Sequence, residues 1–208
     1  MSVSSRLAQQ RSYLAEKLLQ HNIVRFVQTG TYPFTRNDAT DSHPLQVNID
    51  PNLFTEELLA KIGEYVDLLV VINRPRFQAV VSTSSVNTLF ATAFAKDRAL
   101  TDLKMSFSLA VTEVEDLRSV SDTVQTVLML DGLLTDGASQ ITAVRALHKA
   151  GFCVTHLITL IDYGHQGRPN LQELGVTTYS IFTLRDLLEQ YAIDSVHSSP
   201  AQESISGN

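Results

Sequence analysis

Residues 127–151, VLMLDGLLTDGASQITAVRALHKAG, decide the fold. An apolar strand pattern runs into Asp131, a polar turn follows at 135–139, and a helical pattern then places Val144 and Leu147 on one face. In an open α/β sheet, such a loop offers backbone N–H groups and the positive end of a helix dipole to an anion. The spacing alone predicts either an anion site or a capped turn without a ligand.

Outward from this unit, the chain alternates between strand and helix patterns. Five β-rich segments cover residues 77–83, 103–109, 124–132, 151–162 and 177–183. Helical patterns separate most of them, and crossover helices join parallel strands that are buried on both faces. The sequence therefore predicts an α/β protein with one mainly parallel sheet flanked by helices.

The N-terminal part has a different pattern. Residues 5–20 predict an amphipathic helix, and residues 23–27 and 45–49 predict short strands on either side of the polar segment 29–43. A second helix is expected from Thr55, whose hydroxyl suits a helix start, to the neighbourhood of Arg74 and Pro75.

Length and composition favour a single domain. The chain has 208 residues, 44% of them hydrophobic and 18% charged, which is a globular balance. We expect one domain over residues 1–192 and a disordered, Ser-rich tail over 193–208. No apolar run approaches the roughly 18 residues that a membrane helix needs.

Charge and cysteine usage exclude several classes of protein. The net charge of -6 argues against a protein that neutralises nucleic-acid phosphates. A single cysteine, Cys153, excludes an intramolecular disulfide and a multi-cysteine metal cluster, and we expect it to be buried. No signal-peptide pattern is visible at the N-terminus, so a cytoplasmic location is expected.

The order of residues after the buried strand resembles a known motif. Asp131, one further residue, two apolar residues and then Thr135-x-Gly137-x-Ser139 resemble the phosphoribosyl-diphosphate (PRPP) motif of type I phosphoribosyltransferases, in which two acidic residues precede the two apolar ones. The continuation 157–191 is similar to the C-terminal part of orotate phosphoribosyltransferase, which joins orotate to PRPP in UMP synthesis. The resemblance covers residues 7–191, and it implies a small N-terminal hood over about 23–50.

The resemblance also implies ligand-binding residues. Those expected at the phosphate and ribose are Asp131, Thr135, Asp136, Gly137, Ala138 and Ser139, and a diphosphate loop is expected at Ser84 and Ser85. Backbone N–H groups and a helix dipole would still attract an anion if catalysis were lost, although Asp136 adds a negative charge to the loop. No catalytic residue, metal ligand or resident cofactor is assigned, and Mg-PRPP would enter only as the substrate of an active enzyme.

Three departures from the family pattern bear on catalysis. Gly132 stands where the family has a second acid, and Tyr163 stands where the family has an Arg that contacts orotate. The stretch matching the mobile catalytic loop, residues 107–123, is acidic and holds Arg118 as its single cation. A phenol cannot make the charged fork of an arginine, and an acidic loop repels diphosphate. These departures predict a catalytically inactive member.

Other polar residues are weaker candidates. Arg168 can in principle replace the missing Arg, but is more simply a solvent-facing residue, and Arg36 stands near the family's orotate-side Lys. We interpret His148 and His156 as structural, and His165 is the histidine nearest the expected ligand edge.

Three functional hypotheses follow. The first is an inactive member of the family that acts as a structural or regulatory subunit, as a homodimer or in a heteromer with an active homologue. The second is an active phosphoribosyltransferase that converts orotate or another base, with PRPP, to a nucleotide monophosphate. The third is a binding module that senses PRPP or another phosphorylated small molecule.

Overall fold

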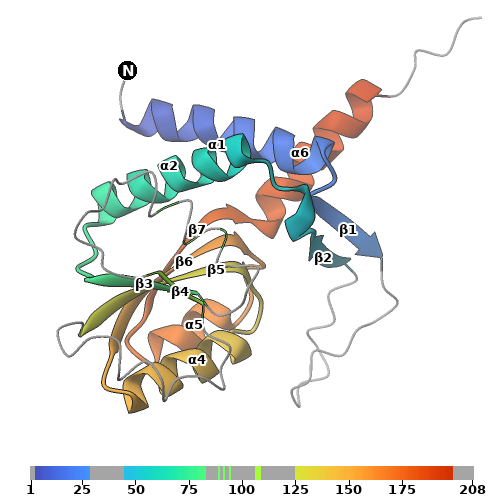
Figure 1. Ribbon diagram of the computed structural model, residues 1–208. Helices are drawn as coiled ribbons and strands as arrows, with labels where there is room; N and C mark the ends of the chain where they lie inside the picture. Colours follow the sequence, from blue (N-terminus) through green and yellow to red (C-terminus); the bar gives the residue numbers. More distant parts are fainter. Residues whose placement is uncertain are drawn as a thin grey trace, which may run out of the picture.

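The protein is a parallel β-sheet between two layers of helices, with a small hairpin at one end (Figure 1). The computed structural model describes residues 3–28, 45–82, 89, 91, 94, 106–108 and 125–198. The N-terminal elements are α1 (Val3–Gln20), β1 (Val24–Gln28), β2 (Leu45–Ile49), a 3₁₀ turn (Pro51–Leu53) and α2 (Glu56–Asn73). The sheet and its helices follow as β3 (Ala79–Ser82), β4 (Ser106–Ser108), β5 (Thr126–Leu134), α4 (Ala138–Lys149), β6 (Cys153–Asp162), α5 (Gly167–Gln172), β7 (Thr177–Thr183) and α6 (Leu184–Ser198).

The main sheet has the order β4-β3-β5-β6-β7 within the described residues, and every neighbouring pair is parallel. The predicted parallel sheet is thus confirmed. Leu134 lies opposite Asp162, and Asp162 lies opposite Thr183. The carboxyl ends of β5, β6 and β7 therefore meet at one edge, which is where open α/β sheets bind ligands.

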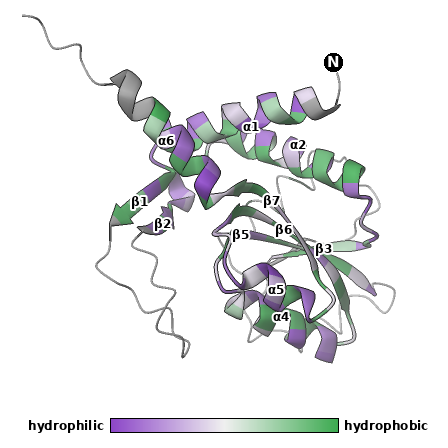
Figure 2. Cartoon of the chain, turned by 180° about the vertical axis from the view of Figure 1, so that it is seen from behind, coloured by the Kyte–Doolittle hydropathy of each residue, from purple (hydrophilic) through white to green (hydrophobic). Residues whose placement is uncertain are grey.

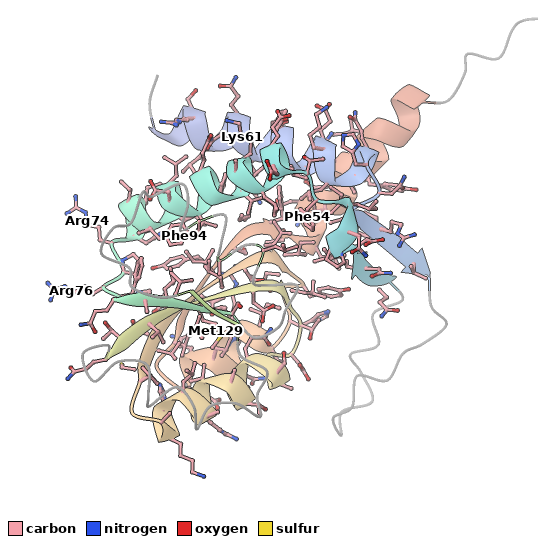
Figure 3. The ribbon with its side chains drawn as sticks, viewed as in Figure 1. Phe54, Lys61, Arg74, Arg76, Phe94 and Met129 are labelled. Atoms are coloured by element: carbon pink, nitrogen blue, oxygen red, sulfur yellow. The ribbon has the colours of Figure 1, made fainter. Side chains whose placement is uncertain are left out.

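Helices cover both faces of the sheet (Figure 1). On one side α1, α2 and α6 enclose a core that includes Phe94, and on the other α4 and α5 enclose a core that includes Met129 (Figure 3). The side chains of Phe94 and Met129 are both fully buried. Because both faces are covered, the central strands are nearly continuous apolar runs.

Helix α2 has the ends that its sequence predicts. The Thr55 hydroxyl accepts a hydrogen bond from the Leu58 backbone N–H at 3.2 Å, and Glu56 follows in the first turn. The helix ends at Arg74, which adopts a left-handed conformation just before Pro75.

Strands β1 and β2 form an antiparallel hairpin apart from the main sheet, and we call this pair the hood hairpin. Val24 pairs with Ile49 and Phe26 pairs with Val47. The predicted hood strands are confirmed, while the segment 29–44 that joins them lies outside the described residues.

The C-terminal boundary differs from the prediction. Helix α6 continues to Ser198, so part of the segment 193–208 that was expected to be disordered is helical. Ser-rich composition is a poor guide there, because a helix already nucleated at Leu184 extends at little cost per residue. No helix among the described residues is long and apolar enough to cross a membrane.

Candidate functional site

The predicted PRPP residues run from the end of β5 to the first turn of α4. We call residues 135–139, which include the first two residues of α4, the β5–α4 loop. Gly137 is the N-terminal cap of α4 and has a φ of 81°. A Cβ atom at Gly137 would lie 3.2 Å from both the Cα and the carbonyl oxygen of Gly167. Glycine is therefore required here, both by the left-handed backbone and by the close approach of the neighbouring loop.

Helix α5 forms two hydrogen bonds with the backbone of the β5–α4 loop. The Gly167 N–H donates to the Thr135 carbonyl at 3.1 Å, and the Asn170 side-chain amide donates to the Asp136 carbonyl at 2.8 Å. A Cβ atom at Gly167 would lie 2.5 Å from that Thr135 carbonyl. The backbone of the β5–α4 loop is thus fixed by two hydrogen bonds and by two glycines in contact.

The Asp131 carboxylate is turned into the protein. It is 6% exposed, and its Oδ1 accepts a hydrogen bond from the Gly132 N–H at 2.6 Å. Its Oδ2 accepts from the Gln140 side-chain amide at 2.7 Å, and the same amide donates to the Leu133 carbonyl at 3.0 Å. Gln140 therefore engages the acid that the resemblance assigns to the ribose.

Gln140 was not among the residues predicted from the sequence. Its side chain is 3% exposed and shares the buried face of α4 with Ala143, Val144 and Leu147. A polar residue at an apolar position of a helical pattern is the signal that was available, because a buried amide needs a hydrogen-bond partner.

Asp136 lies over the start of α4. Its Oδ1 accepts a hydrogen bond from the Ala138 backbone N–H at 3.0 Å, and the Thr135 hydroxyl lies 3.4 Å from the same oxygen. The Ser139 hydroxyl donates to the side-chain amide oxygen Oε1 of Gln140 at 2.9 Å. A carboxylate of the chain itself thus occupies one of the N–H groups that were predicted to meet a phosphate.

Tyr163 connects the end of β6 to the hood hairpin. Its hydroxyl oxygen accepts a hydrogen bond from the backbone N–H of Val47, and the two residues are 7% and 4% exposed. Burial raises the pKa of the Tyr163 hydroxyl, and the Val47 hydrogen bond opposes part of that rise. The phenol is therefore neutral at physiological pH and is part of the fold.

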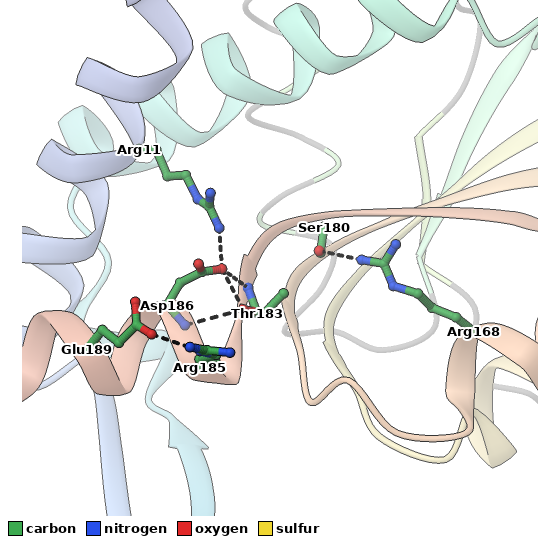
Figure 4. Close-up of polar contacts among 7 residues, drawn as sticks. All are labelled: Arg11, Arg168, Ser180, Thr183, Arg185, Asp186 and Glu189. Carbon is green, nitrogen blue, oxygen red and sulfur yellow. Dashed lines mark hydrogen bonds and ion pairs between the residues drawn. The ribbon is translucent and has the colours of Figure 1, made fainter. Parts of the chain in front are cut away.

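Arg168 corrects a prediction, because it is not simply a solvent-facing residue. Its Nε forms an ion pair with the carboxylate of Asp162, which is 1% exposed. One terminal nitrogen donates to the Thr178 carbonyl at 3.1 Å. The other donates to the Ser180 hydroxyl at 2.7 Å (Figure 4). The guanidinium thus joins the end of β6 to β7, and it neutralises a buried acid.

The histidines take part in local contacts. The Val154 N–H donates to His148 at 3.4 Å, and the Thr155 hydroxyl lies 2.7 Å from Nδ1 of His156. Burial lowers the pKa of His156, whose ring stacks on Tyr179. The prediction for Cys153 is wrong, since this residue is exposed at the first position of β6, where the strand has not yet entered the core.

Several predicted residues lie outside the described part of the chain. These are Arg36, Ser84, Ser85 and, within the expected catalytic loop, residues 109–123. Among the described residues, no group of three or more His, Cys, Asp or Glu side chains is placed to hold a metal ion. A shallow hollow of about 350 Å³ lies beside α6 rather than at the β5–α4 loop, and it is lined by Tyr163, Leu184, Arg185, Leu188, Glu189 and Ala192.

Comparison with known proteins agrees with this geometry. No family model matches the chain. An orotate phosphoribosyltransferase from Synechocystis is 35% identical over 65 residues, which cover 31% of this chain and 33% of that protein. The orotate phosphoribosyltransferase of Chlamydia felis is 22% identical over 190 residues, covering 86% of this chain and 88% of that protein. The more identical matches thus span about a third of the relatives' length.

Solved structures give the fold. Orotate phosphoribosyltransferase from Aeropyrum pernix superimposes with a TM-score of 0.64 at 19% identity, covering 86% of this chain and 99% of that chain. The Mycobacterium tuberculosis enzyme, solved with inorganic phosphate, gives 0.58 at 21% identity, covering 86% and 98%. The chain thus has the fold of these phosphoribosyltransferases. In sequence it is similar to orotate phosphoribosyltransferases, which supports an orotate phosphoribosyltransferase-like protein.

Proposed function

We propose that this chain is a non-catalytic member of the orotate phosphoribosyltransferase family that acts as a structural or regulatory subunit. The observation that carries the proposal is the hydrogen bond between Tyr163 and the Val47 backbone. The resemblance assigns the position of Tyr163 to the Arg that contacts orotate. Here a neutral phenol stands at that position and is committed to the hood hairpin.

The chemistry of orotate makes this substitution costly. A carboxylate that leaves water needs a cation or several aligned donors, and a neutral hydroxyl already engaged with a backbone N–H supplies neither. Arg168 is the nearby cation in the sequence, but its guanidinium is held by Asp162, Thr178 and Ser180. To turn toward orotate it would leave the Asp162 carboxylate buried without its charge partner.

The sugar side of the site supports the same proposal. Gly132 supplies no second acid, and the Asp131 carboxylate receives hydrogen bonds from Gly132 and Gln140. Ribose hydroxyls would compete with these buried donors for the same oxygens. An enzyme of this class has to hold the ribose, the diphosphate and the base in line, and each lost contact reduces the stabilisation of the transition state.

A turnover assay tests the proposal. With orotate, PRPP and Mg²⁺, we expect no nucleotide formation above the background without protein, measured by loss of orotate absorbance. Nucleotide formation from adenine, hypoxanthine or uracil in place of orotate tests the alternative of an active enzyme for another base. Turnover at about 1 per second or faster with any of them, an ordinary enzymatic rate, would contradict the proposal.

A further inference from the structure

We propose that Asp136 is a specificity-determining residue that closes the β5–α4 loop to phosphorylated ligands. The inference rests on the proposed function, because it names the ligand class that this non-catalytic site rejects. It replaces the expectation from sequence that weak anion binding persists here. The cause is a side chain of the loop and not a change of fold.

The Asp136 carboxylate lies where an anion would bind at the start of α4. The first N–H groups of a helix have no acceptor within the helix, and an anion at this end is also favoured by the helix dipole. In this chain the Asp136 carboxylate accepts from the Ala138 N–H at 3.0 Å. A phosphate would have to displace this internal anion and then lie beside its negative charge.

The backbone around Asp136 keeps the carboxylate in place. The Asp136 carbonyl accepts from Asn170 at 2.8 Å, and the preceding Thr135 carbonyl accepts from Gly167 at 3.1 Å. The next residue, Gly137, packs against Gly167 and is itself buried. The loop therefore cannot carry Asp136 away from α4 by a backbone movement without breaking these contacts. A rotation of the side chain alone leaves the charge near the helix end.

A second contact closes the inner side of the loop. Gln140 is 3% exposed, and its amide donates to the Asp131 carboxylate at 2.7 Å and to the Leu133 carbonyl at 3.0 Å. Both acids of the loop region are thus satisfied by groups of the chain itself. Of the two, Asp136 is the one whose charge opposes a phosphate directly, so it is the residue to change.

The test is a gain of binding. Wild type, Asp136→Ala and Asp136→Asn are titrated with inorganic phosphate, and the backbone amide resonances of residues 137–140 are followed by NMR. We expect weak binding at most in the wild type and an affinity roughly twofold to fivefold higher for Asp136→Ala, the size that a charge at a helix end gives. Asp136→Asn should lie between them, since it keeps the acceptor and removes the charge.

A matched control is available at Asp50. Its Oδ1 accepts from the backbone N–H two residues on, that of Asn52, at 3.0 Å, which is the same local contact at another turn. Asp50→Ala should leave the loop resonances unmoved by phosphate. Asp136→Asn keeps an oxygen that can accept the Ala138 hydrogen bond, so this variant is expected to fold. Its amide spectrum without phosphate shows whether it does.

The outcomes separate the two proposals. The role of Asp136 would be overturned if folded Asp136→Ala and Asp136→Asn bound phosphate with the same affinity as the wild type. An equal gain in Asp50→Ala would also overturn it, because the effect would then be one of net charge. The orotate turnover of the wild type decides the proposed function separately, without phosphate titration.

Discussion

Single residues at the ends of elements account for much of the local order, and Asp186 is the clearest case. The Thr183 N–H donates to the Asp186 carboxylate at 2.7 Å, and the Asp186 N–H donates back to the Thr183 hydroxyl at 3.2 Å. This reciprocal pair is a capping box at the start of α6. Arg11 of α1 forms an ion pair with the same carboxylate (Figure 4). One side chain therefore starts α6 and ties it to α1.

The charge of Asp186 predicts a pH dependence of stability. Burial raises the pKa of this carboxyl, but the Thr183 hydrogen bonds and Arg11 outweigh burial, so the pKa lies below its usual value of 3.8. A depressed pKa stabilises the fold above the unfolded-state pKa, and this stabilisation is lost as pH falls through the folded-state pKa. We expect Asp186→Asn to lower the free energy of unfolding by urea at pH 7, and the difference from wild type to shrink as the pH falls below 3.8 and through the folded-state pKa.

Glu189 provides the control for this measurement. Its ion pair with Arg185 lies on the same helix, but the two side chains are 62% and 86% exposed. Glu189→Gln should leave the free energy of unfolding nearly unchanged over the same pH range, because exposed pairs are screened by water. A loss in Asp186→Asn that does not shrink as the pH falls below 3.8 would show that its charge is not the cause.

At the scale of elements, the sequence predicted what is encoded locally and missed what is encoded at a distance. The cap at Thr55 and the glycine at 137 follow from neighbouring residues, and both were predicted. The bond from Val47 to Tyr163 joins residues 116 positions apart, and no local pattern signals it. The three contacts of Arg168 also depend on how α5 packs on β7. The fold was therefore more predictable than the chemistry of its site.

The contact between the hood hairpin and the sheet predicts a local change in exchange. In Tyr163→Phe the buried Val47 N–H loses its acceptor, which costs about 1 kcal/mol for an ordinary hydrogen bond. We expect the Val47 amide to exchange with deuterium roughly fivefold faster or more. Hydrogen exchange followed by NMR measures this directly.

Tyr179→Phe is a suitable comparison for the hood. Tyr179 lies on β7, where its ring stacks on His156. Its removal should leave the Val47 amide unchanged. If Tyr163→Phe exchanges at the wild-type rate while remaining folded, the phenol does not hold the hood hairpin to the sheet.

At the scale of the whole molecule, part of the candidate site lies apart from the two cores. The two cores lie on the two faces of the sheet, whereas Gly132 and Asp136 belong to the carboxyl edge of β5 or to the loop beyond it. Tyr163, which follows β6, is itself part of one core. Substitutions at Gly132 and Asp136 leave the apolar faces intact, and these faces supply most of the stability of such a fold. Contacts with ligands can therefore be lost at this edge while the fold is kept.

Exposed apolar residues on α2 predict that the protein associates with another chain. The C-terminal half of α2 is strongly hydrophobic (Figure 2), and it exposes Val71 and Ile72 at 55% and 45% of their surface. Adjacent exposed apolar side chains on a helix that flanks the sheet favour contact with another chain. We expect a dimer in sedimentation velocity at micromolar concentration, and we expect Val71→Glu to weaken it because a carboxylate is costly to bury in an interface. Thr142→Glu, which adds the same charge to an exposed position of α4 on the other face, should leave the dimer intact. A strict monomer that also fails to bind an active orotate phosphoribosyltransferase would contradict the subunit role, since a structural or regulatory subunit needs a protein partner.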